Sequence, residues 1–359
     1  MIGIDAGNSL DRHPTGVAVY ARNVIRELAL AHPDQRFGWY YRSNRYLRSF
    51  GTKLPSNVSR RLLEEAVLRL RPSQPSLFHG LNQRLPKSLD TIKVATFHDL
   101  FVITGDYSTP EFRDRFAGLA RETASRADHI IAVSEHTAEQ IVKFLGFPRS
   151  RISVVHHGAE ALIAPSPDQC DAIMQRMGVN RPYLLHVGSL QVRKNVTRLV
   201  EAFEIVEEPV DLVLAGARGY GADRIVERVR NSPARARIHV VGHVGDVVRA
   251  CLYARAEALV FPSLEEGFGL PVIEAFAAGL PVIASNVSAL PEVAGGAAML
   301  VDPLRPAGIT EAIHRVLRCS ALRADLRSRG VARVQGVTWQ RCARETWRVY
   351  ERLGAASVS

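Results

Sequence analysis

Residues 265–275 read Glu-Glu-Gly-Phe-Gly-Leu-Pro-Val-Ile-Glu-Ala. Two carboxylates, Glu266 and Glu274, flank a Gly-x-Gly turn, and Pro271 suits the first position of a helix that follows it. Glycine has no Cβ, so backbone N–H groups of the turn can approach a ligand, and the helix N-terminus favours an anion such as phosphate. These groups together suit a nucleotide sugar, with Glu274 accepting hydrogen bonds from a diol. The alternative is a glycine-containing loop before an ordinary core helix.

The longer segment from Phe261 to Ser285 resembles the retaining glycosyltransferases of family four, which carry two glutamates separated by seven residues. The resemblance is specific over residues 256–302 and looser in the first half of the chain. It implies an α/β protein of the GT-B fold. In that fold two Rossmann-like, doubly wound domains face a cleft, and a C-terminal helix returns to the first domain.

Short β-rich apolar runs alternate with helical patterns, which predicts parallel sheets with ligands at the carboxyl ends of the strands. With the resemblance, this gives an acceptor-side N-terminal domain (1–164), a nucleotide-sugar-binding domain (165–337), and a C-terminal helix and tail (338–359) that packs on the N-terminal domain. The candidate strands of the first half are Met1–Asp5, Phe37–Tyr41, Ser76–His79, Lys93–Phe97, His129–Val133 and Ile152–His156. Those of the second half are Tyr183–Val187, Leu212–Ala215, Ile238–Val241, Ala258–Phe261, Pro281–Ala284 and Ala298–Val301.

The chain has 359 residues, 47% of them hydrophobic, which suits two ordinary domains with apolar cores. No apolar run is long enough to span a membrane, and residues 1–7 lack the basic and apolar regions of a signal peptide. The four cysteines lie far apart, without paired spacing. We therefore expect reduced thiols in a cytoplasmic protein, and neither a disulfide framework nor a metal site.

Two adjacent cations, Arg193 and Lys194, follow the first predicted strand of the second half and a loop that begins at Gly188. Such a pair at a strand end suits a diphosphate, whereas a pair before a helix elsewhere is usually solvated. It also resembles the family's Arg/Lys pair, which neutralises the leaving diphosphate. No Asp-x-Asp motif stands where it would hold a divalent metal, so we expect no metal and no other cofactor.

Three further segments have counterparts in the family, although the family often carries two nearby glycines where this chain has Val17 and Ala18 after Gly16. His98 ends a predicted strand and matches the active-site histidine of the mannosyltransferase-like members; taken alone, a structural histidine is the simpler interpretation. Gly16 stands at the start of the first helix, where backbone N–H groups can approach the donor phosphate or the acceptor. The turn at His243 and Val244 follows another strand, and in the family the backbone there meets the base.

Residues 36–61 hold seven basic side chains and no acidic one, with aromatic residues interleaved. A basic-aromatic surface can contact anionic lipid headgroups or a phosphorylated acceptor. Nucleic acid is not expected, because no recognised nucleic-acid-binding module accompanies the charge. The alternative is a buried strand over Phe37–Tyr41 followed by a solvated basic loop.

The resemblance implies transfer of a hexose, expected to be mannose from GDP-mannose, to the hydroxyl of a saccharide or a lipid-linked saccharide. Cations and the helix N-terminus would stabilise the departing diphosphate, and Glu274 would bind the ribose. The expected catalytic residues are His98, Arg193, Lys194 and Glu266. The expected donor-binding residues are Gly16, Gly188, Arg193, Lys194, His243, Val244, Glu266, Gly267, Phe268, Gly269, Leu270 and Glu274.

Three alternatives remain open: a UDP-sugar-dependent glycosyltransferase, a sugar-nucleotide epimerase on the same fold, and a binding protein that has lost catalysis. The intact charged residues of the site argue against the last. We expect a cytoplasmic enzyme that contacts the inner face of a membrane through the basic cluster at residues 36–61.

Overall fold

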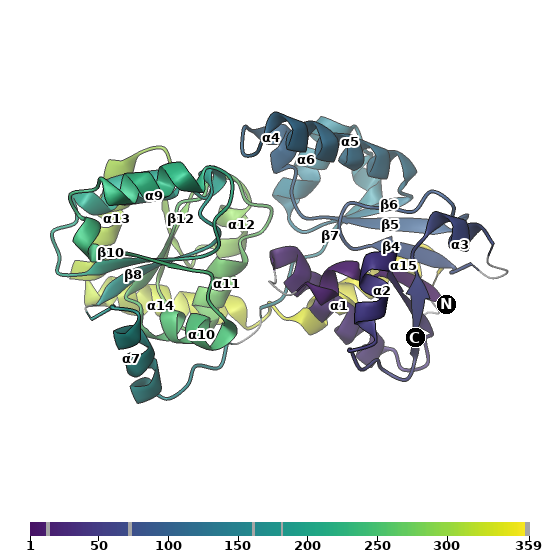
Figure 1. The fold of residues 1–359 in the computed structure, drawn as a ribbon, viewed down its shortest axis with the longest axis horizontal. Helices are drawn as coiled ribbons and strands as arrows, with labels where there is room; N and C mark the ends of the chain where they lie inside the picture. The colour runs from purple at the N-terminus through teal and green to yellow at the C-terminus, as the bar shows by residue number, and fades with distance from the viewer. Residues whose placement is uncertain (12–14, 71–73, 160–161, 181, 356–359) are drawn as a thin grey trace. The chain divides into compact units, whose positions relative to one another are not determined.

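The computed structural model describes residues 1–11, 15–70, 74–159, 162–180 and 182–355. The chain forms two compact units, each built on one parallel sheet (Figure 1). The first unit comprises Met1–Thr104, Pro110–Gly158 and Val337–Ser359, and the second comprises Gly105–Thr109 and Ala159–Gly336. This confirms the predicted α/β fold class.

The first unit contains a seven-stranded sheet in the order β3-β2-β1-β4-β5-β6-β7, and all neighbouring strands are parallel. The strands are β1 (Ile2–Asp5), β2 (Phe37–Tyr41), β3 (Val58–Leu62), β4 (Leu77–Gly80), β5 (Ile92–Phe97), β6 (His129–Ala132) and β7 (Ile152–Val154). Because β1 pairs with β2 on one side and β4 on the other, the sheet reverses its winding direction there. Ligands of doubly wound sheets bind at such a switch point.

Two helices of the first unit, α1 and α6, begin at side-chain caps. Thr15 accepts a hydrogen bond from the Ala18 N–H, and Ser134 accepts one from the Thr137 N–H. The helices are α1 (Gly16–Ala31), α2 (Ser43–Ser49), α3 (Glu65–Arg69), α4 (Phe101–Thr104), α5 (Pro110–Arg126), α6 (Glu135–Leu145) and α15 (Trp339–Arg352), with 3-10 turns η1 (Gly7–Leu10) and η2 (Arg149–Arg151).

The C-terminal helix α15 packs against α1 of the first unit, as the fold class predicted. The Tyr350 hydroxyl lies 2.6 Å from His79 Nδ1 on β4, and His79 Nε2 lies 2.8 Å from Thr96 Oγ1 on β5. Gly158 permits the close approach of the helix start, since a Cβ there would lie 2.2 Å from the Trp339 nitrogen. Side chains far apart in the sequence therefore fix this helix on the first sheet.

Residues 36–61 do not form one continuous basic-aromatic surface. Trp39, Tyr40 and Tyr41 lie on β2 and are buried, so they are not available to a membrane or an acceptor. The segment expected as a basic loop contains α2 and the strand β3, which the sequence analysis missed. All five residues of β3 are partly exposed, because it is an edge strand, and its sequence Val-Ser-Arg-Arg-Leu lacks an apolar run.

The second unit contains a six-stranded parallel sheet in the order β10-β9-β8-β11-β12-β13. All six predicted strands are present, with small shifts at their ends: β8 (Tyr183–Val187), β9 (Asp211–Ala215), β10 (Ile238–Gly242), β11 (Ala258–Phe261), β12 (Val282–Ser285) and β13 (Met299–Val301). The helices are α7 (Pro167–Arg176), α8 (Val196–Glu204), α9 (Ala222–Arg230), α10 (Asp246–Arg255), α11 (Leu270–Ala277), α12 (Leu290–Ala294), α13 (Pro306–Arg318) and α14 (Ser320–Val334), with 3-10 turns η3 (Val192–Lys194) and η4 (Arg235–Arg237).

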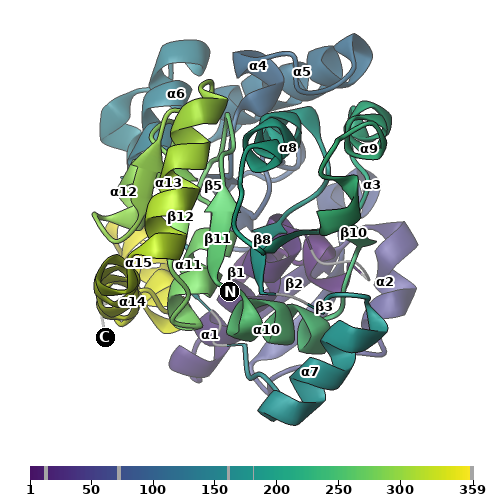
Figure 2. The same cartoon turned by 90° about the vertical axis from the view of Figure 1, so that its left-hand side faces the viewer.

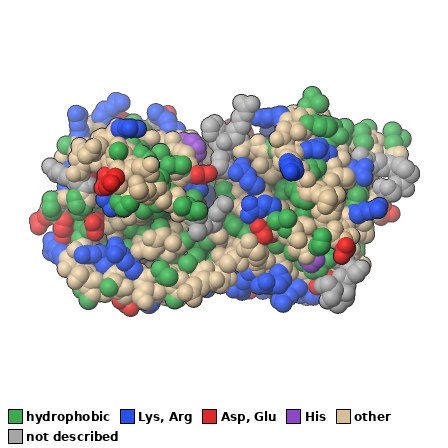
Figure 3. All heavy atoms as spheres, turned by 90° about the horizontal axis from the view of Figure 1, so that it is seen from below, with side chains coloured by type: hydrophobic (Ala, Val, Ile, Leu, Met, Phe, Trp, Pro, Cys, Tyr) green, Lys and Arg blue, Asp and Glu red, His purple; other side chains and the backbone are tan. Residues whose placement is uncertain are grey.

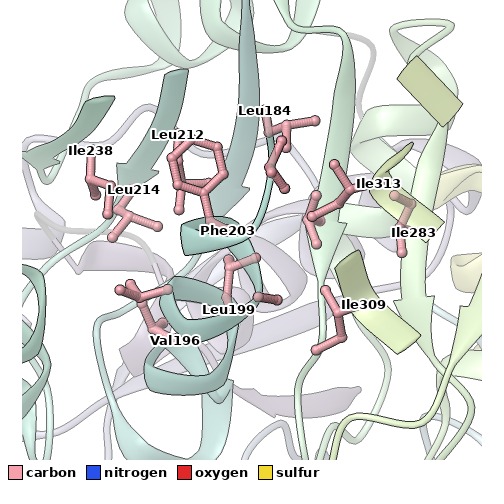
Figure 4. Close-up of a cluster of buried hydrophobic side chains, with 14 of the residues drawn as sticks. Leu184, Val196, Leu199, Phe203, Leu212, Leu214, Ile238, Ile283, Ile309 and Ile313 are labelled. Carbon is pink, nitrogen blue, oxygen red and sulfur yellow. The ribbon is translucent and has the colours of Figure 1, made fainter. Parts of the chain in front are cut away.

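Helices cover both faces of the second sheet, as a parallel sheet requires. Figures 1 and 2 show α8, α9 and α13 on one face and α10 and α11 on the other. Leu184, Leu212 and Ile283 point from three strands toward Phe203 of α8 and Ile313 of α13, and all five are fully buried (Figure 4). This packing fixes the positions of the strand ends and of the loops that follow them.

Two of the four cysteines contradict the expectation of reduced thiols. Cys170 on α7 and Cys251 on α10 form a disulfide, with Cα atoms 5.1 Å apart and a sequence separation of 81 residues. Packing of α7 against α10 brings them together, which linear spacing cannot indicate. Cys319 and Cys342 are free thiols.

Lys and Arg side chains are scattered over both units on the face that Figure 3 shows, in keeping with a formal net charge of +10. None of the helices in the described ranges combines the length and apolar character that crossing a bilayer requires.

Candidate active site

Glu266 lies at the centre of a buried charged cluster beyond the carboxyl ends of β8 and β11. Arg193 Nη1 donates to Glu266 Oε2 at 3.1 Å and to the backbone carbonyl of Glu265 at 2.6 Å. The Lys194 ammonium donates to the other carboxylate oxygen, Glu266 Oε1. Arg193, Lys194 and Glu266 are only 9%, 8% and 6% exposed. The structure thus brings together three of the residues that the sequence assigned to catalysis.

The Glu266 carboxyl is ionised at neutral pH. Burial raises the pKa of Glu266, but the charges of Lys194 and Arg193 outweigh it and hold the pKa of this carboxyl below its usual value. Burial lowers the pKa of the neighbouring His186 to about 4, so that ring is neutral. A buried ion cluster gains little net stability because its members lose their hydration. Its position at the strand ends is therefore better explained by a ligand than by stability.

Asn195 fixes the loop that carries the two cations. It adopts a left-handed φ of 58°, which asparagine tolerates better than most residues, and it separates the η3 turn from α8. Its Nδ2 donates to the carbonyls of Pro262 at 3.0 Å and Pro303 at 2.7 Å. One amide therefore ties together the loops that follow β8, β11 and β13.

The Gly-x-Gly turn leads directly into α11, as predicted. Gly269 has a φ of 105°, and a Cβ at this position would lie 2.6 Å from Leu290 Cδ2. Gly267, Phe268 and Gly269 are buried, and Leu270 is half-buried as the first residue of α11. The turn therefore needs glycine for both its conformation and its packing.

Glu274 lies on α11 and is held by two side chains of α10. The Tyr253 hydroxyl donates to Glu274 Oε2 at 2.8 Å, and Arg249 Nη1 lies 3.5 Å from Glu274 Oε1. Burial, and then the Glu274 charge beside it, raise the pKa of Tyr253 well above its usual value, so this hydroxyl stays protonated and donates. The Glu274 carboxylate is thereby oriented before any ligand binds.

The remaining predicted residues of the second unit follow its strands. Gly188 comes directly after β8, and Gly216 comes directly after β9. A Cβ on Gly216 would lie 1.9 Å from the Gly188 carbonyl oxygen, so the backbones of the loops after β8 and β9 are in contact. His243 is exposed and Val244 is half-buried, and both follow β10. Like the charged cluster, His243 and Val244 lie at the carboxyl ends of the strands. They are two strands away from β8, because β9 lies between β10 and β8.

His98 and Gly16 belong to the first unit. His98 Nε2 lies 2.9 Å from the Leu81 carbonyl oxygen, and burial lowers the pKa of His98 to about 4. Its ring packs edge-on against Tyr20, with centroids 4.8 Å apart. Gly16 is exposed at the first position of α1, where Thr15 provides the cap.

The sequence analysis missed Tyr253, Arg249 and Ser288, whose Oγ accepts from the Glu266 N–H at 3.2 Å. No local pattern marks them, because each meets its glutamate only when the second unit has folded. Asn195 carried a signal, since asparagine is enriched in left-handed turns.

Across the described ranges, no group of three or more His, Cys, Asp or Glu side chains is arranged to hold a metal ion. The site offers two cations, backbone N–H groups at the N-terminus of α11, and two carboxylates. Cations and a helix N-terminus suit a diphosphate, and an oriented carboxylate suits neighbouring hydroxyls.

Comparison with known proteins gives matches to both halves of the chain. Residues 14–161 match the family model Glycosyltransferase Family 4, and residues 173–333 match Glycosyl transferases group 1. The O-antigen chain mannosyltransferase B of Escherichia coli is 28% identical over 370 residues, which cover 94% of this chain and 96% of that protein.

Two solved structures share the fold over nearly their whole length. Sucrose-phosphate synthase from Thermosynechococcus elongatus superimposes with a TM-score of 0.78 at 23% identity, covering 99% of each chain. HepE from Anabaena, solved in complex with UDP and glucose, has a TM-score of 0.76 at 18% identity, again covering 99% of each chain. These similarities confirm the GT-B fold that the sequence predicted.

Proposed function

Because the chain belongs to glycosyltransferase family four, we propose that it transfers a hexose, with retention, from a nucleoside-diphosphate sugar to a saccharide or lipid-linked saccharide hydroxyl. The observation that carries this proposal is the buried cluster of Arg193, Lys194 and Glu266 beside the N-terminus of α11. Such a site neutralises a departing diphosphate with fixed charges and dipoles.

Each group of the second unit has a separate role in this proposal. Arg193, Lys194 and the α11 N-terminus bind the diphosphate, and Glu274 accepts from the ribose hydroxyls. Glu266 and the N–H groups of the Gly267–Gly269 turn bind the donor sugar. Glu266 also holds the Lys194 ammonium in place until the diphosphate arrives.

His98 supplies an acceptor in the first unit. The Leu81 carbonyl can only accept, so the hydrogen of the neutral His98 ring lies on Nε2. Nδ1 is then a buried acceptor, and it has no hydrogen-bond partner among the described residues. We assign it to a sugar hydroxyl near the reacting carbon. In a front-face mechanism the leaving phosphate takes the acceptor's proton, so no protein base is required.

The proposed donor is GDP-mannose. Its support is the similarity, over almost the full chain, to a protein named as a mannosyltransferase. The similarity to HepE, whose complex contains UDP, favours a UDP-sugar as the second candidate. The proposed transfer needs no divalent metal, because Arg193 and Lys194 provide the positive charge at the diphosphate.

A donor screen followed by a turnover assay tests the proposal. Thermal shifts with GDP-, UDP- and ADP-sugars should single out the donor, with GDP-mannose giving the largest stabilisation. Nucleotide release should then depend on an added saccharide acceptor, and proton NMR of the product should show the anomeric configuration of the donor. Conversion of the donor sugar to another sugar without an acceptor would identify the epimerase alternative.

A second proposal concerns α2, which we assign to peripheral contact with an anionic membrane. Leu47 and Phe50 are 79% and 59% exposed, and Arg48 and Lys53 beside them are exposed cations. Each cation near an anionic surface contributes about 1 kcal/mol. Sedimentation with anionic vesicles should retain the protein, and less so in high salt or after Leu47→Ser and Phe50→Ser. The matched control is Leu30→Ser, which removes a leucine of α1 that is 61% exposed. Equal retention by neutral vesicles counts against this assignment.

A further inference from the structure

A small pocket of about 130 Å³ lies in the first unit at the carboxyl ends of β1, β2 and β4. Asp5 ends β1, Arg42 follows β2, and Arg84 lies in the segment after β4; all three side chains line the pocket. This is the switch point of the first sheet, where doubly wound sheets bind their ligands. The volume equals about four water molecules at 30 Å³ each, enough for one phosphate group.

The segment that carries Arg84 is held firmly. It folds over the end of β4, where a Cβ on Gly80 would lie 1.9 Å from the Arg84 carbonyl oxygen. The Gln83 N–H donates to the Thr96 carbonyl at 3.0 Å, and the Thr123 hydroxyl donates to the Gln83 carbonyl at 2.7 Å. Arg84 is thus presented to the pocket by a preorganised backbone.

The carboxylates around the pocket already have backbone partners. Asp5 Oδ1 accepts from the Gly7 N–H at 3.0 Å, and Glu64 Oε1 accepts from the Ser43 N–H at 3.1 Å. Glu65 accepts from the N–H groups of Lys87 at 2.8 Å and Ser88 at 2.9 Å. These carboxylates therefore stabilise the surrounding loops.

The two arginines have no such partners. Within the described ranges, neither the Arg42 nor the Arg84 guanidinium takes part in a hydrogen bond or a salt bridge with another residue, although Arg84 lies over the Phe116 ring at 6.0 Å. Burial and the nearby positive charge of Arg42 lower the pKa of Arg84, and the charge of Asp5 opposes them only in part. A further anion between the two guanidinium groups would therefore reduce their mutual repulsion. Two planar guanidinium groups suit the oxygens of a phosphate.

We propose that this pocket binds the phosphate group of a phosphorylated saccharide, with Arg42 and Arg84 on the phosphate oxygens and Asp5 on a sugar hydroxyl. The interpretation of this ligand as the acceptor rests on the proposed function, but the binding itself does not. The pocket thereby selects acceptors that carry a phosphate group.

Calorimetric titration of the full chain with mannose 6-phosphate and with mannose tests the proposal. The phosphorylated sugar should bind, and its affinity should fall at least tenfold in Arg84→Met and in Arg42→Met. Arg22→Met, which removes an exposed arginine of α1, is the matched control and should bind as the wild type does. Circular dichroism should confirm that each variant is folded.

The Arg193→Met variant separates this pocket from the diphosphate site. It should keep its affinity for mannose 6-phosphate while losing affinity for GDP. Loss of mannose 6-phosphate binding in Arg193→Met but not in Arg84→Met would overturn the proposal, as would equal affinity for mannose or no binding by the wild type. If the wild-type protein bound mannose 6-phosphate but not GDP, that result would instead count against the proposed function.

Discussion

Replacement of Glu274 by alanine should weaken nucleotide binding without unfolding the protein. The carboxylate is oriented by the Tyr253 hydroxyl at 2.8 Å and by Arg249, so it is preorganised to accept from the ribose hydroxyls. A hydrogen bond to a charged group contributes about 1.5–3 kcal/mol. Since each 1.4 kcal/mol is a factor of ten, the Kd for GDP should rise about 10- to 150-fold.

The assay is calorimetric titration with GDP and with its 2′,3′-dideoxy analogue. The wild type should discriminate between the two nucleotides by a similar factor, and Glu274→Ala should bind them almost equally. Tyr253→Phe keeps the carboxylate but removes the bond that orients it, so its GDP affinity should lie between those of the wild type and Glu274→Ala. If folded Glu274→Ala still prefers GDP over the dideoxy analogue by the wild-type factor, Glu274 does not bind the ribose and the reasoning is wrong.

Three further predictions follow from other parts of the chain. Transfer activity should survive EDTA because Arg193 and Lys194 neutralise the diphosphate; activity that disappears in chelator and returns only with a divalent ion would contradict this. The free energy of unfolding should fall as the pH drops from 6.5 toward 4, because burial lowers the pKa of His186 to about 4 and the unfolded chain alone binds a proton in that window. For this group the loss is about 3 kcal/mol, and urea unfolding of His186→Asn should show a smaller fall than the wild type. Reduction of the disulfide between Cys170 and Cys251 should lower the free energy of unfolding by up to about 4.5 kcal/mol, from the sequence separation of 81 residues that it closes, and thermal unfolding of Cys170→Ala should not respond to reductant.

The second unit was largely predictable because its signals are local. Its strands are apolar runs bounded by turns, and Glu266, Gly269 and Glu274 stand within one short segment whose turn chemistry can be read directly. The first unit was less predictable at its edge. The strand β3 has no apolar run, and α2 and α3 are too short to show a helical period.

Contacts between distant residues could not be predicted from the sequence. Cys170 meets Cys251 because α7 packs on α10, and Tyr253 meets Glu274 because α10 lies beside α11. The spacing of these residues along the chain does not indicate that either pair is in contact. The same holds for Asp5, Arg42 and Arg84, which come together only because β1 pairs with both β2 and β4.

The central claim is that the cluster of Arg193, Lys194 and Glu266 binds the diphosphate of the donor. Titration of the wild type and of Lys194→Met with GDP and with guanosine tests it most directly. The account predicts that Lys194→Met loses at least tenfold in affinity for GDP and leaves the weak affinity for guanosine unchanged, because only the diphosphate contacts this cation. An unchanged affinity for GDP in the folded variant would contradict the account.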